Sequence, residues 1–238
     1  MKIKFILAYF KKCFFKPTKN PYPIRIIRTI CRLPIIFDLL SLILQILDIK
    51  KLNVINNDSE KDKHYEKVKN HNAGVSQSKL ITTTRRAEIL YQILNCSLGD
   101  KIKDNKLLIV GPRNIQELFL AWTYGFSWKN IEGIDLYSTN YKIKVMNMEK
   151  MSYEENLFDC ITMANTLVYA KSISKAISET SRILKPGGSF VFGSTYCPED
   201  KLYPQSAIDG MSLQKILSKQ SLNIFTSISV DKINAINL

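Results

Sequence analysis

The stretch that decides the fold runs from residue 106 to residue 193 and opens with KLLIVGPRNI at residues 106–115. Its four consecutive apolar residues, 107–110, are typical of a parallel strand that is covered on both faces. Gly111 begins a turn that leads into an expected helix over residues 115–124. Such a turn places backbone N–H groups and a helix N-terminus at the carboxyl edge of a sheet, where doubly wound folds bind ligands.

A second expected strand, residues 130–135, ends in Asp135, which follows Gly111 by 24 residues. A carboxylate at this place can accept hydrogen bonds from the hydroxyl groups of a ribose. The alternative interpretation is that Asp135 caps a helix or a turn. Gly111 lets a ligand approach the backbone closely, but the stretch lacks the G-x-G-x-x-G pattern of dinucleotide-binding turns.

The rest of the chain continues the alternation of strands and helices. Further strands are expected over residues 142–148, 158–164 and 189–194, with helices over residues 85–94, 172–184 and 213–218. The sequence Pro186-Gly187-Gly188 is expected to end the second of these helices. Residues 223–230 and 233–238 complete the set as an antiparallel pair. This alternation predicts an α/β fold with a doubly wound, mostly parallel sheet.

Four sequence motifs carry a resemblance to a known family. They read LIVG at residues 108–111, GIDL at 133–136, NMEKMSYEENLFD at 147–159 and RILKPGG at 182–188. In this order and with these gaps, the series resembles the class I S-adenosylmethionine-dependent methyltransferases of the small methyltransferase-domain type. The resemblance covers about residues 80–230. It implies a Rossmann-like, seven-stranded sheet with helices on both faces, and S-adenosylmethionine as the cofactor.

The resemblance also assigns positions around the cofactor. Gly111 is expected beneath the methionine moiety, Asp135 on the ribose, Met148 beside the adenine, and Asn165 near the methionine end or the substrate. The full set of residues expected to bind the cofactor is Gly111, Pro112, Arg113, Asp135, Leu136, Asn147, Met148 and Asn165. No catalytic base and no metal ligand is assigned.

The first turn departs from the family pattern. The family usually has an acid and three glycines there, whereas this chain has Ile109 in place of the acid and one glycine, followed by Pro112, Arg113 and Asn114. Gly-Pro-Arg followed by Glu117 also resembles a divergent branch of the family. Arg113 and Glu117 lie four residues apart, so either they pair with each other or Arg113 contacts the carboxylate of the cofactor. Asn147 stands where an Asp is common.

The N-terminal region differs in composition from the rest. Residues 1–37 carry nine Lys/Arg and no acid, interleaved with aromatic and aliphatic residues, and the apolar stretch 33–47 is shorter than a membrane span needs. Two interpretations stay open: peripheral contact with an anionic membrane surface through residues 1–50, or a helix packed on the domain or on a partner subunit. The expected division is a basic, apolar N-terminal extension (1–52), a linker (53–78) and a methyltransferase-like domain (79–238).

Charge and cysteine content bear on location and partners. The net charge of +13 is concentrated in residues 1–50, which hold ten Lys/Arg against Asp38 and Asp48. Five scattered cysteines without a Cys-x-x-Cys pair are typical of a reducing compartment, so a cytoplasmic location is expected. The protein would be membrane-associated if the N-terminal extension binds lipid.

Three functions remain as hypotheses. The first is S-adenosylmethionine-dependent methyl transfer to a small-molecule, lipid or glycan acceptor. The second is a non-catalytic binding module that retains the fold. The third, a nucleic-acid methyltransferase, is suggested only by the net charge, and nucleic acid is not the expected partner because the basic residues alternate with large apolar ones.

Overall fold

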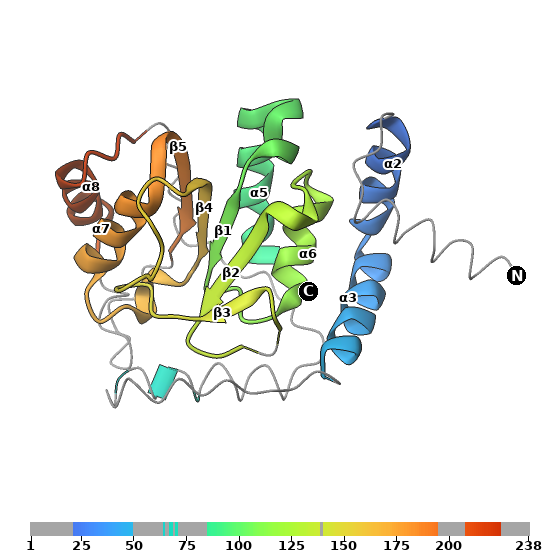
Figure 1. Ribbon diagram of the computed structural model, residues 1–238, viewed down its shortest axis with the longest axis horizontal. Helices are drawn as coiled ribbons and strands as arrows, with labels where there is room; N and C mark the ends of the chain where they lie inside the picture. Colours follow the sequence, from blue (N-terminus) through green and yellow to red (C-terminus); the bar gives the residue numbers. More distant parts are fainter. Residues whose placement is uncertain are drawn as a thin grey trace, which may run out of the picture.

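A five-stranded parallel sheet forms the centre of the molecule, with strand order β3-β2-β1-β4-β5 (Figure 1). The computed structural model describes residues 21–49, 64, 67, 68, 70, 85–138, 140–194 and 208–224. The strands are β1 (Leu107–Val110), β2 (Ile131–Asp135), β3 (Ile143–Val145), β4 (Phe158–Ala164) and β5 (Leu184–Gly193). The order reverses between β1 and β4, and ligands bind beyond the carboxyl ends of strands at such a point. The predicted α/β class is confirmed.

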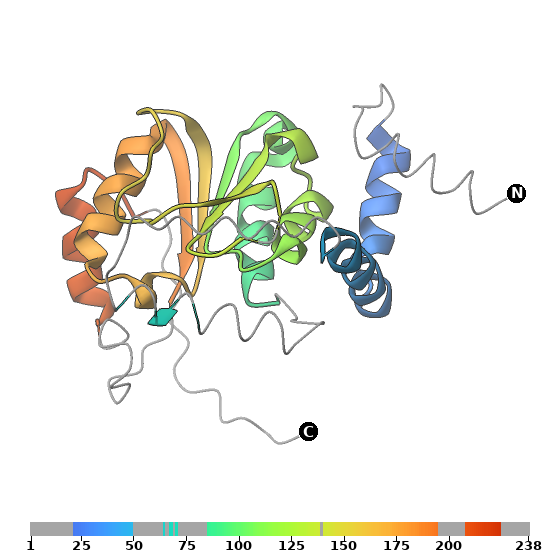
Figure 2. The same ribbon diagram turned by 60° about the horizontal axis from the view of Figure 1, so that its bottom comes forward.

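Helices cover both faces of this sheet (Figure 2). The described helices are α2 (Pro21–Cys31), α3 (Pro34–Ile49), α5 (Arg85–Leu98), α6 (Ile115–Thr123), α7 (Ile173–Ile183) and α8 (Gly210–Lys219), with 3-10 turns at Gly99–Asp104, Trp128–Asn130 and Leu167–Tyr169. On β1, Leu107 and Ile109 join the apolar cluster under α5 and α6, whereas Leu108 and Val110 join the cluster under α7. Successive side chains of a strand point to opposite faces, so a continuous apolar run needs cover on both.

Helix α6 lies between the sheet and a third layer made by α2 and α3 (Figure 1). All nine of its residues are buried. The ring of Phe37 on α3 stacks on that of Phe119 on α6, with centroids 5.4 Å apart. Because α6 is apolar nearly all round, it needs cover on its outer side as well. One side of α3 therefore packs on the domain, in agreement with one of the two interpretations of residues 33–47.

Arg28 attaches α2 to the domain. Its guanidinium donates to the carbonyl oxygens of Gly125 (2.9 Å) and Phe126 (3.1 Å) and lies 5.2 Å from the centre of the Trp122 ring. Burial, together with the smaller effect of the neighbouring charge of Arg32, lowers the pKa of Arg28 to about 10. Charge-assisted hydrogen bonds of this kind compensate for part of the desolvation.

Among the described residues, no single helix has the length and apolarity to cross a bilayer. The segments Pro23–Cys31 and Pro34–Ile46 meet that criterion only as a pair, and the chain bends by 89° between them.

Some predicted boundaries were wrong. The strand β5 begins at Leu184, before the Pro-Gly-Gly sequence, and a register shift lets the extra residues bulge out between the pairs Phe158↔Leu184 and Cys160↔Ser189. Helix α8 is longer than residues 213–218 because Asp209 caps it, accepting from the backbone N–H of Ser212 at 2.7 Å.

In α5, Leu90, Tyr91 and Leu94 are buried and Ile89 is exposed. Five strands lie in the described part of the chain, whereas seven were expected. The two predicted strands at residues 223–230 and 233–238 lie, from residue 225 onward, outside the described residues.

Candidate functional site

Asp135 closes β2 and faces the first turn after β1. Its Oδ2 accepts from the backbone N–H of Arg113 at 3.1 Å, and its Oδ1 accepts from that of Leu136 at 2.7 Å. The residue is 6% exposed, and burial raises the pKa of its carboxyl to about 6 although these N–H groups and the charge of Arg113 lower it. Desolvation disfavours the ionised form, and hydrogen bonds to that form favour it. The turn and the end of β2 are thus joined at this carboxylate.

The turn itself has an unusual backbone. Arg113 has φ 57°, and Asn165, directly after the neighbouring strand β4, has φ 60°. Positive φ is uncommon for residues other than glycine, although asparagine tolerates it, and strained residues cluster at functional sites. The backbone N–H of Asn165 donates to the carbonyl oxygen of Gly193 at 2.7 Å, which holds this residue at the end of β4. Two strained residues therefore lie at adjacent strand ends.

Gly111 packs against Thr166, a residue that the sequence analysis did not identify. Gly111 has φ 73°, and a Cβ placed on it would lie 2.4 Å from Cγ2 of Thr166. Thr166 is held there because its hydroxyl donates to the carbonyl oxygen of Val110 at 2.9 Å. The need for glycine here therefore comes from the backbone conformation and from Thr166. The contact of Gly111 with a cofactor stays a prediction.

A buried polar cluster lies behind the turn. The Tyr91 hydroxyl donates to Oε1 of Glu117 at 3.1 Å, so the Glu117 carboxyl has a buried tyrosine partner from α5. Burial raises the pKa of Glu117 to about 8, the charge of Asp135 raises it as well, and that of Arg113 lowers it. Both Tyr91 and Glu117 are at most 5% exposed. No local sequence pattern links them, because they come from different helices.

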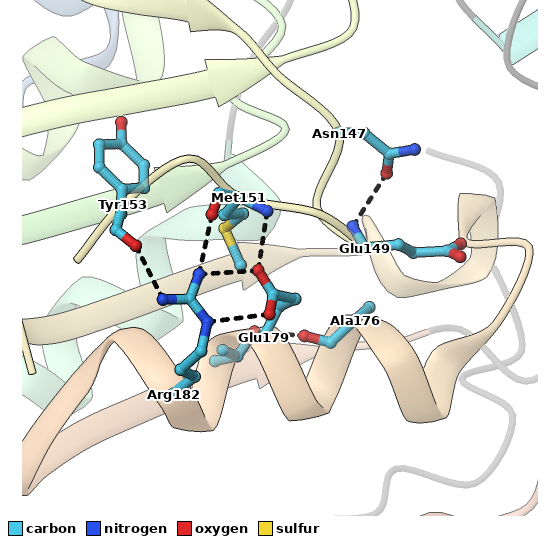
Figure 3. A network of polar contacts seen from close by, with 8 residues as sticks. Asn147, Glu149, Met151, Tyr153, Ala176, Glu179 and Arg182 are labelled. Carbon is cyan, nitrogen blue, oxygen red and sulfur yellow. Dashed lines mark hydrogen bonds and ion pairs between the residues drawn. The ribbon is translucent and has the colours of Figure 1, made fainter. Parts of the chain in front are cut away.

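The segment after β3 is held by α7 (Figure 3). The guanidinium of Arg182 donates to the carbonyl oxygens of Tyr153 (2.7 Å) and Met151 (2.8 Å) and pairs with Glu179 at 2.9 Å. Glu179 in turn accepts from the backbone N–H of Met151 at 2.8 Å. A planar guanidinium suits such a forked set of acceptors. Arg182 was part of the RILKPGG motif, but only the structure shows that it holds residues 151–153.

The start of the same segment carries two of the residues expected at the cofactor. Asn147 uses its Oδ1 to accept from the backbone N–H of Glu149 at 2.9 Å, and Glu149 accepts from those of Lys171 (2.5 Å) and Ser172 (2.9 Å). The side chain of Met148 is 7% exposed and belongs to the apolar cluster on the α7 side of the sheet. Met148 is thus a core residue, and its place beside an adenine stays a prediction.

The remaining expected residues lie around the first turn. Pro112 is buried, with its Cγ 2.9 Å from the position of an added Cβ on Gly133 in β2, and Leu136 is half-buried directly after Asp135. The structure therefore joins Gly111, Pro112, Arg113, Asp135 and Leu136 through contacts between the first turn and the end of β2. Asn147 contacts Glu149, Met148 lies in the apolar cluster on the α7 side, and the backbone of Asn165 contacts Gly193.

Comparison with known proteins agrees with this architecture. Residues 125–192 match a family model described as a methyltransferase domain. A ubiquinone/menaquinone biosynthesis C-methyltransferase from Brucella canis is 37% identical over 70 residues, which are 28% of this chain and 26% of that protein. Over this segment the chain is similar to the methyltransferase domain of S-adenosylmethionine-dependent enzymes. The similarity implies S-adenosylmethionine as the cofactor.

Two further proteins are similar to this chain, one in sequence and one in fold. The enzyme of the same name from a Marinomonas species is 36% identical over 66 residues. A chain in the Haloferax volcanii complex between a methyltransferase activator and a methyltransferase aligns with a TM-score of 0.51 and 14% identity, over 72% of this chain and 80% of that one. The second likeness concerns the fold alone. The chain matches about a quarter of the length of the curated relatives, 26% in each case.

Proposed function

We propose that this protein transfers the methyl group of S-adenosylmethionine to a small-molecule, lipid or glycan acceptor. The observation that carries the proposal is the hydrogen bond between the Asp135 carboxylate and the backbone of the first turn, 3.1 Å long, beside the point where the strand order reverses. In doubly wound folds an acid at the end of the second strand accepts from ribose hydroxyls. The match of residues 125–192 to the methyltransferase domain supports the same cofactor.

The chemistry of the Asp135 carboxylate fits the ribose end of this cofactor. An ionised carboxylate offers about four acceptor positions, and the backbone N–H groups of Arg113, Leu136 and Tyr137 use up to three of them. Acceptor capacity is therefore left for ligand hydroxyls. Hydrogen bonds from those hydroxyls would favour the ionised form and lower the pKa that burial has raised.

Arg113 is proposed to act beside Asp135. Its positive charge lowers the pKa of both Asp135 and Glu117, so it lies within electrostatic range of both carboxyls. The same cation suits the carboxylate of a methionine moiety. The bound cofactor supplies an electrophilic methyl group on sulfur, and the task of the chain is to hold that group in line with an acceptor atom.

Among the acceptor classes, a lipid is the first to test. The curated relatives are named ubiquinone/menaquinone biosynthesis C-methyltransferases. Transfer to carbon of a quinone-type ring is therefore the reaction with which a screen of acceptors should begin, followed by polar small molecules and glycans.

The test is calorimetric titration of the full chain with S-adenosylhomocysteine, with NADH as the control ligand. Micromolar binding of the first ligand alone is the expected result. The second step is transfer of a labelled methyl group to lipid extracts and then to aqueous metabolite extracts. Labelled product in either extract establishes the activity, and its partition indicates the acceptor class.

A second candidate is a non-catalytic module that retains the fold. Thr166 favours it, because its side chain occupies the space directly against Gly111. A folded protein that binds neither ligand, or that binds S-adenosylhomocysteine but labels no acceptor, would support this alternative. The net charge of +13 remains the sole argument for a nucleic-acid substrate.

A further inference from the structure

The outer side of the α2–α3 layer is an exposed apolar face. Exposed aliphatic side chains follow one stripe of α3 at Ile35, Leu39, Ile43 and Ile46. A second stripe runs along α2 through Ile26 and Ile30 to Leu33 in the turn between the helices. The intervals of three and four residues place each set on one side of its helix. Eleven large hydrophobic side chains are exposed in the described chain, and seven of them lie on these two helices or in the turn between them.

This face is fixed in position by the inner side of the same helices. Arg28 donates to Gly125 and Phe126, Phe37 stacks on Phe119, and Arg25 pairs with Asp100 beside α5. Ser41 and Cys31 are buried on that inner side. The helices therefore have one side attached to the domain and the other exposed. A group of exposed apolar side chains on helices that are attached to the domain marks an interaction surface.

The sequence directly before α2 indicates the partner. Residues 1–20 contain six lysines and no acidic residue, together with five aromatic residues, Phe5, Tyr9, Phe10, Phe14 and Phe15. A lysine-rich segment is attracted to anionic lipid headgroups, and aromatic rings favour the interface between headgroups and acyl chains. The outward stripe of α3 has no Lys or Arg, so it can enter the apolar part of that interface.

We propose that the face formed by Ile26, Ile30, Leu33, Ile35, Leu39, Ile43 and Ile46 docks on an anionic lipid membrane surface. The two helices lie in the plane of the interface, with their aliphatic side chains among the acyl chains, and the positive charge of residues 1–20 adds attraction to the anionic headgroups. Since α6 begins directly after the first turn and α3 packs on α6, the docked layer is one helix away from the candidate cofactor site. The proposal rests on this exposed face and does not depend on the proposed methyl-transfer activity.

The charge of the N-terminal residues favours an anionic membrane over a second copy of the chain as the partner of this face. Two copies that met through this face would bring together two basic segments, each with nine Lys/Arg and no acid in residues 1–37. Like charges at short range oppose such a contact, whereas an anionic bilayer attracts both the segment and the face behind it.

The experiment is sedimentation of the full chain with lipid vesicles. The vesicles consist of phosphatidylcholine alone or of phosphatidylcholine with about one third phosphatidylglycerol, an anionic lipid. The wild-type protein is expected to partition onto the anionic vesicles at least about tenfold more strongly. The variant Ile35→Asp with Leu39→Asp is expected to lose at least about tenfold in that partition, because two carboxylates replace side chains that enter the acyl region.

A matched control carries the same chemistry elsewhere. Ile89→Asp with Met211→Asp changes two exposed apolar side chains on α5 and α8, 52% and 73% exposed, and is expected to bind within about twofold of wild type. A second face variant, Ile30→Asp with Ile43→Asp, provides an independent test in case the first variant does not fold. Circular dichroism checks that each variant melts like wild type.

Three results would overturn the proposal. Wild-type protein that stays in the supernatant with anionic vesicles excludes lipid docking. In the second result, both face variants bind like wild type, and exchange of the six lysines for glutamine abolishes binding. The contact would then belong to residues 1–20 alone. In the third result, sedimentation velocity shows a dimer of the wild-type protein, the face variants are monomers, and no protein binds vesicles. The face would then contact a second copy of the chain.

Discussion

The backbone N–H of Arg113 and the carboxylate of Asp135 are hydrogen bonded at 3.1 Å, across the gap between the turn after β1 and the end of β2. The contact joins the left-handed conformation of Arg113 to a carboxyl that is almost fully buried. A change in the charge of Asp135 should therefore alter both the conformation of the turn and the binding of a ligand to it.

Replacing Asp135 should weaken cofactor binding without unfolding the domain. We expect Asp135→Ala to reduce the affinity for S-adenosylhomocysteine at least tenfold, about 1.4 kcal/mol, because the ribose loses its acceptor. Calorimetric titration measures the change. The control is Asp159→Asn, since Asp159 lies near the opposite end of its strand and pairs with Lys185 at 2.7 Å. Unchanged affinity in folded Asp135→Ala would remove this residue from the site.

The stability of the ligand-free protein should fall as the pH rises from about 5 to about 8. Burial raises the pKa of Glu117 from 4.5 to about 8, so the folded protein keeps a proton that the unfolded chain releases in this range. The free energy of unfolding then decreases with pH, by up to the order of 4 kcal/mol from this group. Asp135, with its pKa raised to about 6, acts in the same direction between about pH 4 and pH 6.

Glu117→Gln isolates that effect. The amide still accepts from the Tyr91 hydroxyl but cannot ionise, so the variant should lose most of the decrease above pH 6 and become more stable than wild type near pH 8. Urea unfolding across this pH range gives both curves. Glu88→Gln is the control, because Glu88 also accepts from a tyrosine, Tyr124, but is half-buried. Parallel curves for wild type and Glu117→Gln would show that Glu117 does not carry the proton.

Gly111→Ala should be destabilising through two separable causes. The positive φ costs about 1–2 kcal/mol for any residue with a Cβ, and the clash with Cγ2 of Thr166 at 2.4 Å adds to it. We expect a total of at least about 2 kcal/mol, of which the double variant with Thr166→Ala recovers about 1 kcal/mol relative to the sum of the single changes. Urea unfolding of the four proteins measures this coupling. Strictly additive effects would mean that the backbone shifts to avoid Thr166.

Arg182→Ala should destabilise the protein by about 1–3 kcal/mol, since its guanidinium makes charge-assisted hydrogen bonds to Met151 and Tyr153 as well as to Glu179. Arg182→Lys should recover little, because an ammonium cannot bridge the same acceptors. Arg25→Ala, which removes a pair with Asp100 at an exposed site, should cost less than about 1 kcal/mol. Equal losses in Arg182→Ala and Arg25→Ala would contradict the role assigned to the network in Figure 3.

Local sequence was enough to predict most of the domain. Residues 107–110 were expected to be a strand buried on both faces, and both apolar clusters meet on β1. The strand at residues 158–164 was predicted with its observed limits. The start of β5 was not predicted, because the bulge depends on how the residues of β5 pair with those of β4.

The site shows the same division. The position of Asp135 at the end of β2 was predicted from the strand pattern before it and from its spacing of 24 residues from Gly111, both of which are visible in the local sequence. Tyr91 contacts Glu117 on α6, Thr166 contacts the end of β1, and Arg182 contacts the segment after β3. Each partner is more than 20 residues away, so no local sequence pattern predicts the contact.

By itself the sequence determined the α/β class, the strand order along the chain, the acid at the end of the second strand and the basic character of residues 1–37. Apolar periodicity and turn chemistry are local properties, so they are visible without a fold. Only the tertiary structure decided that α3 covers α6 with one face and exposes the other, and that Glu117 is buried against Tyr91. Burial and pKa depend on what other segments bring into contact, which the order of residues does not contain.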